Sequence, residues 1–156
     1  MNLIETVVYV MLFGVLLGSV TASFTGRKAY AVRAAVQSFG ALLDEGRAVA
    51  QTSGSGATIA IVSDGSSGFS ATLYPFRPLP GADTSASALR AISAGVGLTP
   101  TAIFLSSSGT ASAAAWTPGS GTPATEPPCN KTIALTFTDG TLSEAHTIAC
   151  ATSLLQ

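Results

Sequence analysis

The sequence is poor in charge and in the side chains that most metal sites require. Only 10% of its 156 residues are charged and the formal net charge is −1, so no strong field attracts nucleic acid or an anionic membrane surface. It has one histidine and two cysteines, without a CxxC pair, so zinc ligation and thioredoxin-like redox chemistry lack their ligands. We therefore expect no strong nucleic-acid binding, no metal site and no cofactor.

The motifs of common enzyme classes are also missing. The sequence has no P-loop, dinucleotide fingerprint, EF-hand loop or GxSxG motif. His146 and Glu144 lie two positions apart, and because no nucleophile motif accompanies them, we interpret them as a hydrogen-bonded pair at the rim or in the core of a sheet. We predict that the chain is not an enzyme and has no catalytic residue.

The two cysteines, Cys129 and Cys150, favour a structural disulfide. Disulfides persist in the periplasm or outside the cell and are rare in the cytosol. The low charge of the chain after its N-terminal segment is also typical of a surface exposed outside the cell. Both features predict an exported domain.

A long apolar run is present at the N-terminus. Residues 7–24 read VVYVMLFGVLLGSVTASF, and these 18 residues would span about 27 Å as a helix, close to the hydrocarbon thickness of a bilayer. We predict a membrane-spanning helix. A secretory signal cleaved after Ala22 is the alternative, but its start should be basic, whereas here Arg27 and Lys28 follow the apolar run.

The residues ahead of this run carry a family resemblance. Leu3-Ile4-Glu5 places a carboxylate at the entrance of an unbroken apolar helix, with no Lys or Arg before it. We expect that a short basic leader preceded Met1 and has been removed, which would explain the missing positive charge. In these features the N-terminus resembles those of mature type IV pilins and type II secretion pseudopilins, over about a third of the chain.

The resemblance implies a processed subunit. In that family a prepilin peptidase cuts before the first residue, here Met1, and methylates its amine, while Glu5 corresponds to the family's buried carboxylate. Independently, a carboxylate at membrane depth costs at least about 2.5–3.5 kcal/mol, so such residues usually have a partner. In a filament of staggered parallel helices the amine of Met1 on an adjoining subunit can pair with Glu5. Solvation of Glu5 at the membrane interface is the alternative.

Gly14 and Gly18 form a GxxxG within the apolar run. This spacing lets helices approach closely in membranes, and each glycine also costs about 1 kcal/mol of helix stability relative to alanine. Many pilins lose helicity near these positions in the filament, but they often carry a proline where this chain has Ala22. We expect the two glycines to act in assembly.

Apolar residues at helical spacing continue past the apolar run, at Val32, Val36, Phe39 and Leu43. We predict that the helix continues to about residue 51 and is closed by the glycines at 54 and 56. The chain then divides into an N-terminal helix, residues 1–52, whose first 26 residues form the membrane and filament half, and a β-rich head, residues 53–156.

The head has the alternating pattern and the Gly, Pro and Asp turns of an antiparallel β domain. The predicted strands are Ala57–Ser63, Phe69–Phe76, Ala102–Ser107, Thr110–Trp116, Thr132–Thr138 and Thr141–Ala149. A short helix is predicted over residues 85–94 and a loop over residues 117–128. The predicted fold class is therefore α+β, with a long helix packed against an antiparallel head. A two-sheet head with a final hairpin loosely resembles the FimT-like minor pseudopilins.

Asp139-Gly140 predicts a two-residue turn in the last hairpin. Pairing about this turn places Cys129 opposite Cys150 in a non-hydrogen-bonded pair, where Cα atoms lie about 4.5 Å apart. A disulfide-bounded C-terminal region also resembles many pilins. The same register puts one set of apolar side chains on a single face of the hairpin. These are Ile133, Leu135, Phe137, Leu142 and Ile148.

We therefore predict a structural subunit, preferably the major one, of a type IV pilus or similar extracellular filament. Its expected partners are identical subunits in a helical filament, the prepilin peptidase and the inner-membrane assembly machinery. Before assembly it would be a single-pass inner-membrane protein, and afterwards part of a cell-surface filament. A minor pilin or pseudopilin serving secretion or DNA uptake is one alternative. A membrane-anchored binding domain that does not polymerise is the other.

Overall fold

The computed structural model describes residues 3–63, 68–76, 88–99, 102–113 and 131–156, and within them the side chains of residues 7–13 and of all residues from 29 onward. These ranges form one helix, α1 (Leu3–Ser53), and nine strands. The strands are β1 (Ala57–Ser63), β2 (Phe69–Tyr74), β3 (Arg90–Ala94), β4 (Gly97–Thr99), β5 (Ala102–Leu105), β6 (Ala111–Ala113), β7 (Thr132–Thr138), β8 (Ser143–Ala149) and β9 (Leu154–Leu155). The predicted α+β class, with a helix against antiparallel sheets, is confirmed.

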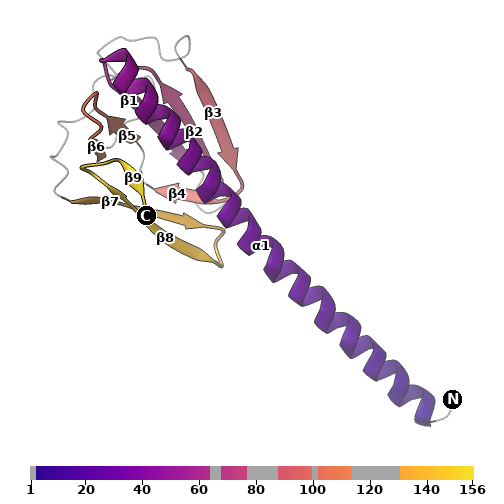
Figure 1. The fold of residues 1–156 in the computed structure, drawn as a ribbon. Helices are drawn as coiled ribbons and strands as arrows, with labels where there is room; N and C mark the ends of the chain where they lie inside the picture. The colour runs from indigo at the N-terminus through magenta and orange to yellow at the C-terminus, as the bar shows by residue number, and fades with distance from the viewer. Residues whose placement is uncertain (1–2, 64–67, 77–87, 100–101, 114–130) are drawn as a thin grey trace.

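The strands form two antiparallel sheets. Sheet A has the order β3-β2-β1-β5-β6 and sheet B the order β4-β7-β8-β9. β4 belongs to sheet B although it lies between two strands of sheet A in the sequence. Figure 1 shows the C-terminal part of α1 lying across the sheets, while its N-terminal part extends far from them.

The core lies between the C-terminal part of α1 and the inner faces of both sheets. The predicted periodicity of this part of the helix is confirmed, because Val32, Phe39 and Leu43 are buried and Val36 packs against the core. Phe39 meets Phe69 of sheet A and Phe137 of sheet B edge to face, with ring centroids 6.3 Å and 5.8 Å away. One helical side chain therefore joins the two sheets.

The end of α1 follows the predicted glycine signal. The helix ends at Ser53, and Gly54 and Gly56 take φ angles of 68° and 81°. This left-handed conformation is readily adopted by glycine and closes helices. The chain then enters β1, whose bounds are those predicted.

The predicted register of the last hairpin is wrong by two residues. Thr138 pairs with Ser143, so Cys150 faces position 131, whose carbonyl accepts its N–H at 3.0 Å. The two-residue turn needs positive φ at both central residues, but only Gly140, at 88°, adopts it. Asp139 instead uses its carboxylate to order a four-residue turn. Because the shift is even, the apolar face survives, except that Leu142 is exposed in the turn.

The helix predicted over residues 85–94 is also wrong where the structure describes it. Residues 90–94 form β3, which pairs with the edge of β2 from Leu73 to Phe69. Ile92 and Ala94 pack against the core on one face of this strand. Pairing and burial at the sheet edge therefore outweigh the helix preference of Ala, Leu and Arg. Residues 85–87 and the loop predicted over 117–128 lie outside the described residues.

Candidate assembly site

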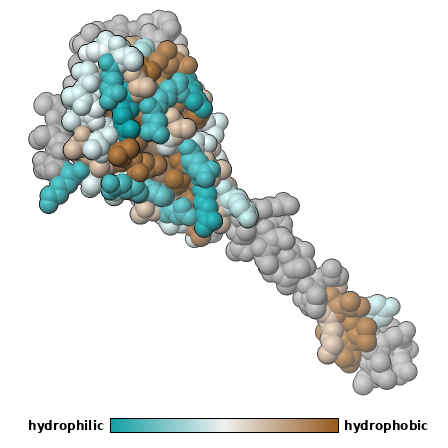
Figure 2. Space-filling model, in the orientation of Figure 1, coloured by the Kyte–Doolittle hydropathy of each residue, from teal (hydrophilic) through white to brown (hydrophobic). Residues whose placement is uncertain are grey.

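The N-terminal part of α1 exposes a sleeve of apolar side chains. Residues 7–13 are all apolar or aromatic, and each is between 46% and 68% exposed. In Figure 2 this segment is the brown band at the distant end of the helix, far from the head. A helix that is apolar all round is stable only when a membrane or other helices bury it. The sleeve, defined as residues 7–13, is therefore a candidate assembly surface.

The residues predicted to act in assembly surround this sleeve. Glu5, Gly14 and Gly18 lie within α1, but their side-chain surroundings, like all of Met1, are outside the described part of the chain. Among the residues whose side chains are described, no helical stretch is long and apolar enough to span a bilayer. Residues 14–24 of the predicted span are outside that set, so the structure leaves the roles of these residues as predictions.

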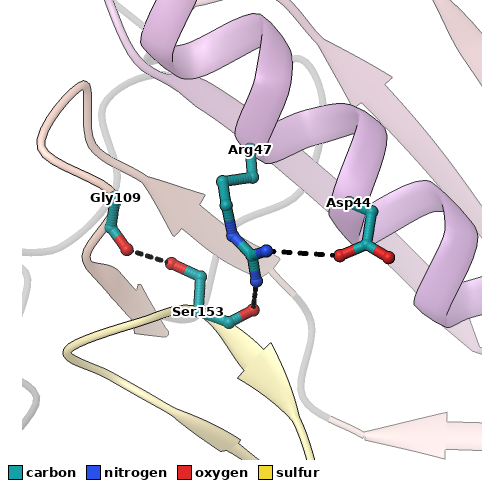
Figure 3. A network of polar contacts seen from close by, with 4 residues as sticks. All are labelled: Asp44, Arg47, Gly109 and Ser153. Atoms are coloured by element: carbon teal, nitrogen blue, oxygen red, sulfur yellow. Dashed lines mark hydrogen bonds and ion pairs between the residues drawn. The ribbon is translucent and has the colours of Figure 1, made fainter.

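A polar junction fixes the other end of α1 to the head (Figure 3). The Arg47 guanidinium donates a hydrogen bond to the carbonyl oxygen of Ser153 and lies 3.4 Å from the Asp44 carboxylate. The Arg47 side chain is 20% exposed, whereas that of Asp44 is 70% exposed. The bond to Ser153 is therefore better shielded from water than the surface ion pair, and it contributes more to holding the C-terminal turn.

Ser153 is unusual in its backbone as well as its contacts. It is fully buried and has a φ of 54°, which makes it the one non-glycine residue with positive φ in the described part of the chain. Its hydroxyl donates a hydrogen bond to the carbonyl oxygen of Gly109 in the β5–β6 turn. Its N–H donates a hydrogen bond to the carbonyl oxygen of Ala149 at 2.7 Å. A serine held in this conformation costs about 1–3 kcal/mol, so its surroundings must enforce it.

The neighbouring cysteine joins the same junction. Cys150 is buried and disulfide-bonded, and its carbonyl oxygen accepts the N–H of Ala111 in β6 at 2.8 Å. Cys129, the chain's other cysteine, lies outside the described residues, so the predicted geometry of the pair is untested. The turn at residues 150–153 thus connects sheet B to the edge of sheet A and to α1.

His146 and Glu144 lie beside each other at the rim of sheet B, as predicted, but their side chains are too far apart for the predicted hydrogen bond. The His146 Nε2 lies 3.7 Å from a Glu144 carboxylate oxygen, and its Nδ1 lies 3.2 Å from the carbonyl oxygen of Gln156. The imidazole also stands edge to face on Phe137, with centroids 5.9 Å apart. Both side chains are about a quarter to a third exposed. In the described part of the chain no three His, Cys, Asp or Glu side chains gather as metal ligands.

The Arg47 junction was not predicted from the sequence. A Ser-Gly pair at 108–109 signals a turn, and Arg47 looks like an ordinary polar residue on an amphipathic helix. Nothing local indicates that Ser153, 106 residues later, supplies the acceptor. Such a contact depends on how the two sheets meet, which no sequence spacing specifies.

No known protein family, curated protein or solved structure matches this chain.

Proposed function

We propose that this chain is a structural subunit of a type IV pilus or pilus-like extracellular filament, and not an enzyme. The observation that carries the proposal is the sleeve of residues 7–13, which exposes apolar side chains on every side. The head already has a core of its own, drawn from α1 and both sheets. The sleeve therefore needs burial from outside the subunit, by lipid before assembly and by neighbouring helices afterwards.

The sequence around the sleeve favours a filament over a simple anchor. Glu5 lies two residues before the sleeve in the same helix, and a carboxylate there is costly in a bilayer unless it is paired. The amine of Met1 on an adjoining subunit is a partner that only an assembly of parallel helices can supply. In this proposal α1 is the long pilin-like helix, with residues 1–26 in the membrane or filament core and the remainder under the head.

The proposal is tested by Glu5→Ala in the full chain, expressed in a cell that carries pilus assembly machinery. Thr6→Ala is the matched control, because it also removes a polar side chain next to the apolar run. We expect both variants in the membrane fraction at normal levels. Filaments sheared from the surface should fall at least tenfold for Glu5→Ala and remain normal for Thr6→Ala.

Two other outcomes would redirect the proposal. Normal filaments with Glu5→Ala would show that the carboxylate does not set the stagger of the helices. A wild-type chain that stays in the membrane and never appears in sheared filaments would favour the anchored binding domain. If the chain is present only in trace amounts in filaments of another protein, it is a minor subunit.

A further inference from the structure

The stretch of α1 that joins the sleeve to the head carries positive charge only. From residue 6 to residue 43 the charged residues are Arg27, Lys28 and Arg33, with no Asp or Glu among them. The net charge of the whole chain is −1, so these cations create no long-range field. They can act only on groups that lie close to them, at the level where the helix holds them.

Tyr30 and Arg33 lie on the surface of α1 where the head begins. Tyr30 is 73% exposed, and Arg33 is exposed as well. Residues three apart are neighbours on one side of a helix, so the two side chains lie next to each other. Val32, between them in the sequence, is fully buried and belongs to the core. The pair is therefore level with the end of the head from which the helix emerges.

The helix sets the distance between the sleeve and this pair. α1 is continuous from Leu3 to Ser53 (Figure 1), and at about 1.5 Å per residue its residue 27 lies about 30 Å from residue 7, the first of the sleeve. The hydrocarbon core of a bilayer is also about 30 Å thick. A bilayer that buries the helix from residue 7 thus ends its hydrocarbon near residue 27. Tyr30 and Arg33 then lie about 5 and 9 Å further on, at the level of the lipid headgroups.

We propose that Tyr30 and Arg33, together with Arg27 and Lys28, form a collar that binds the headgroups of anionic phospholipids before assembly. This inference rests on the proposed function, which places the helix in a membrane at that stage. Tyrosine is favoured at the membrane surface because its ring is apolar and its hydroxyl is polar. Arginine pairs strongly with phosphate, and basic residues next to a membrane helix attract anionic lipid. The collar fixes the depth at which the head rests on the membrane.

Charge complementarity favours a lipid over a second subunit as the partner of Arg33. The described carboxylates from residue 29 onward already contact a cation or a hydrogen-bond donor of their own subunit. They are Asp44, Glu45, Asp139 and Glu144. Arg33 has no ion pair with any residue that the structure describes. A lipid phosphate at the level of the collar can pair with Arg33 without breaking an existing contact.

The test measures which lipids surround the full chain in reconstituted vesicles. Phosphatidylcholine vesicles carry a trace of spin-labelled phosphatidylglycerol or of spin-labelled phosphatidylcholine, and electron paramagnetic resonance compares the association of the two lipids with the protein. We expect the wild type to prefer phosphatidylglycerol, and added salt to weaken this preference. Arg33→Gln should lower the preference about two- to fivefold, whereas Arg33→Lys keeps the charge and should keep most of it.

Lys131→Gln is the matched control, because it removes one positive charge from the other end of the head. Lys131 is exposed, and its carbonyl oxygen accepts the N–H of Cys150, in the turn that Arg47 holds. Arg47 lies about 21 Å beyond Arg33 along α1. We expect this variant to leave the lipid preference unchanged. Thermal melting in detergent checks that each variant is folded.

A second measurement tests the depth of the collar. A nitroxide is attached to Ala31→Cys or to Ala41→Cys, two exposed positions that lie about 15 Å apart along α1. Collisions of the nitroxide with oxygen and with a water-soluble nickel complex report its depth in the vesicle. We expect the label at position 31 among the headgroups and the label at position 41 in water.

The outcomes separate this inference from the proposed function. The inference is overturned if Arg33→Gln and Lys131→Gln give the same lipid preference, or if the two nitroxides lie at the same depth. Fewer filaments with Arg33→Gln, at an unchanged lipid preference, would also overturn it and would assign Arg33 to a contact between subunits. Failure of the wild type to float with phosphatidylcholine vesicles would instead refute the membrane stage of the proposed function.

Discussion

Arg47, near the end of α1, donates a hydrogen bond to the backbone carbonyl oxygen of Ser153, 106 residues further along the chain. This contact ties the helix to the C-terminal turn, which also holds Gly109 and Ala111 of the β5–β6 hairpin. Removing the guanidinium leaves a poorly hydrated carbonyl without this donor.

Arg47→Met should lower the free energy of unfolding by about 1–3 kcal/mol, the usual cost of leaving a shielded polar group unsatisfied. Methionine keeps most of the aliphatic stem, so the loss reports on the hydrogen bond. Asp44→Ala is the control, and it should cost less than about 1 kcal/mol because its ion pair is at the surface. Chemical denaturation of the full chain in detergent measures both. Equal losses of stability in the two variants would mean that the hydrogen bond to Ser153 contributes no more than the surface ion pair.

Glycines 40 and 46 of α1 should respond oppositely to alanine. A Cβ on Gly46 would lie 2.9 Å from Leu105 Cδ1 and 3.1 Å from Leu73 Cδ1, in the buried core, whereas one on Gly40 meets only Leu155 Cδ2 at 3.5 Å. Overpacking costs about 1–3 kcal/mol, and alanine gains up to about 1 kcal/mol in a helix. Gly40→Ala should therefore raise the melting temperature and Gly46→Ala should lower it. A higher melting temperature for both would mean that the helix shifts easily on sheet A.

The β7–β8 turn should depend on the Asp139 carboxylate. One of its oxygens accepts hydrogen bonds from the N–H of Thr141, the hydroxyl of Thr141 and the N–H of Leu142, at 2.9, 2.8 and 2.7 Å. Asp139→Ala should cost about 1–2 kcal/mol of stability, whereas Asp139→Asn keeps an acceptor and should cost less. Thermal melting compares the two. A neutral effect of Asp139→Ala would mean that these hydrogen bonds do not stabilise the turn.

The two cysteines should form one bond within each subunit. Non-reducing mass spectrometry of purified filaments should give the mass of an oxidised monomer, with one peptide pair linking Cys129 and Cys150. Replacing both by serine should cost about 3 kcal/mol, because closing a loop of this length restricts the unfolded chain. Two free thiols, or a covalent dimer, would contradict the assignment.

The class of the fold and most strands could be predicted from the sequence because they depend on local patterns. β1 and β7 have the predicted bounds, since alternation and flanking turns mark them clearly. The register of β8 was wrong because it depends on how Asp139 uses its side chain, which the Asp-Gly signal does not specify. β3 was predicted as a helix because its composition favours one. Its pairing with the edge of β2 could not be read from local sequence, because the two segments are separated along the chain.

The candidate site divides in the same way. The apolar sleeve is visible from residue type alone, so the sequence identifies it without a structure. The junction of Arg47 and Ser153 arises only when sheet B lies beside the β5–β6 hairpin. The positive φ of Ser153 has no sequence signal, because serine rarely adopts it.

The placement of β4 has a consequence for how the head folds. The chain leaves sheet A after β3, contributes β4 to sheet B, and returns to sheet A with β5. β4 pairs with β7, whose first residue comes 33 positions after the last residue of β4. During synthesis β4 cannot pair until β7 has been made, and any loss of β7 leaves the segment between β3 and β5 without its partner strand in sheet B. The two sheets should therefore unfold in one cooperative transition, with no stable half-folded head.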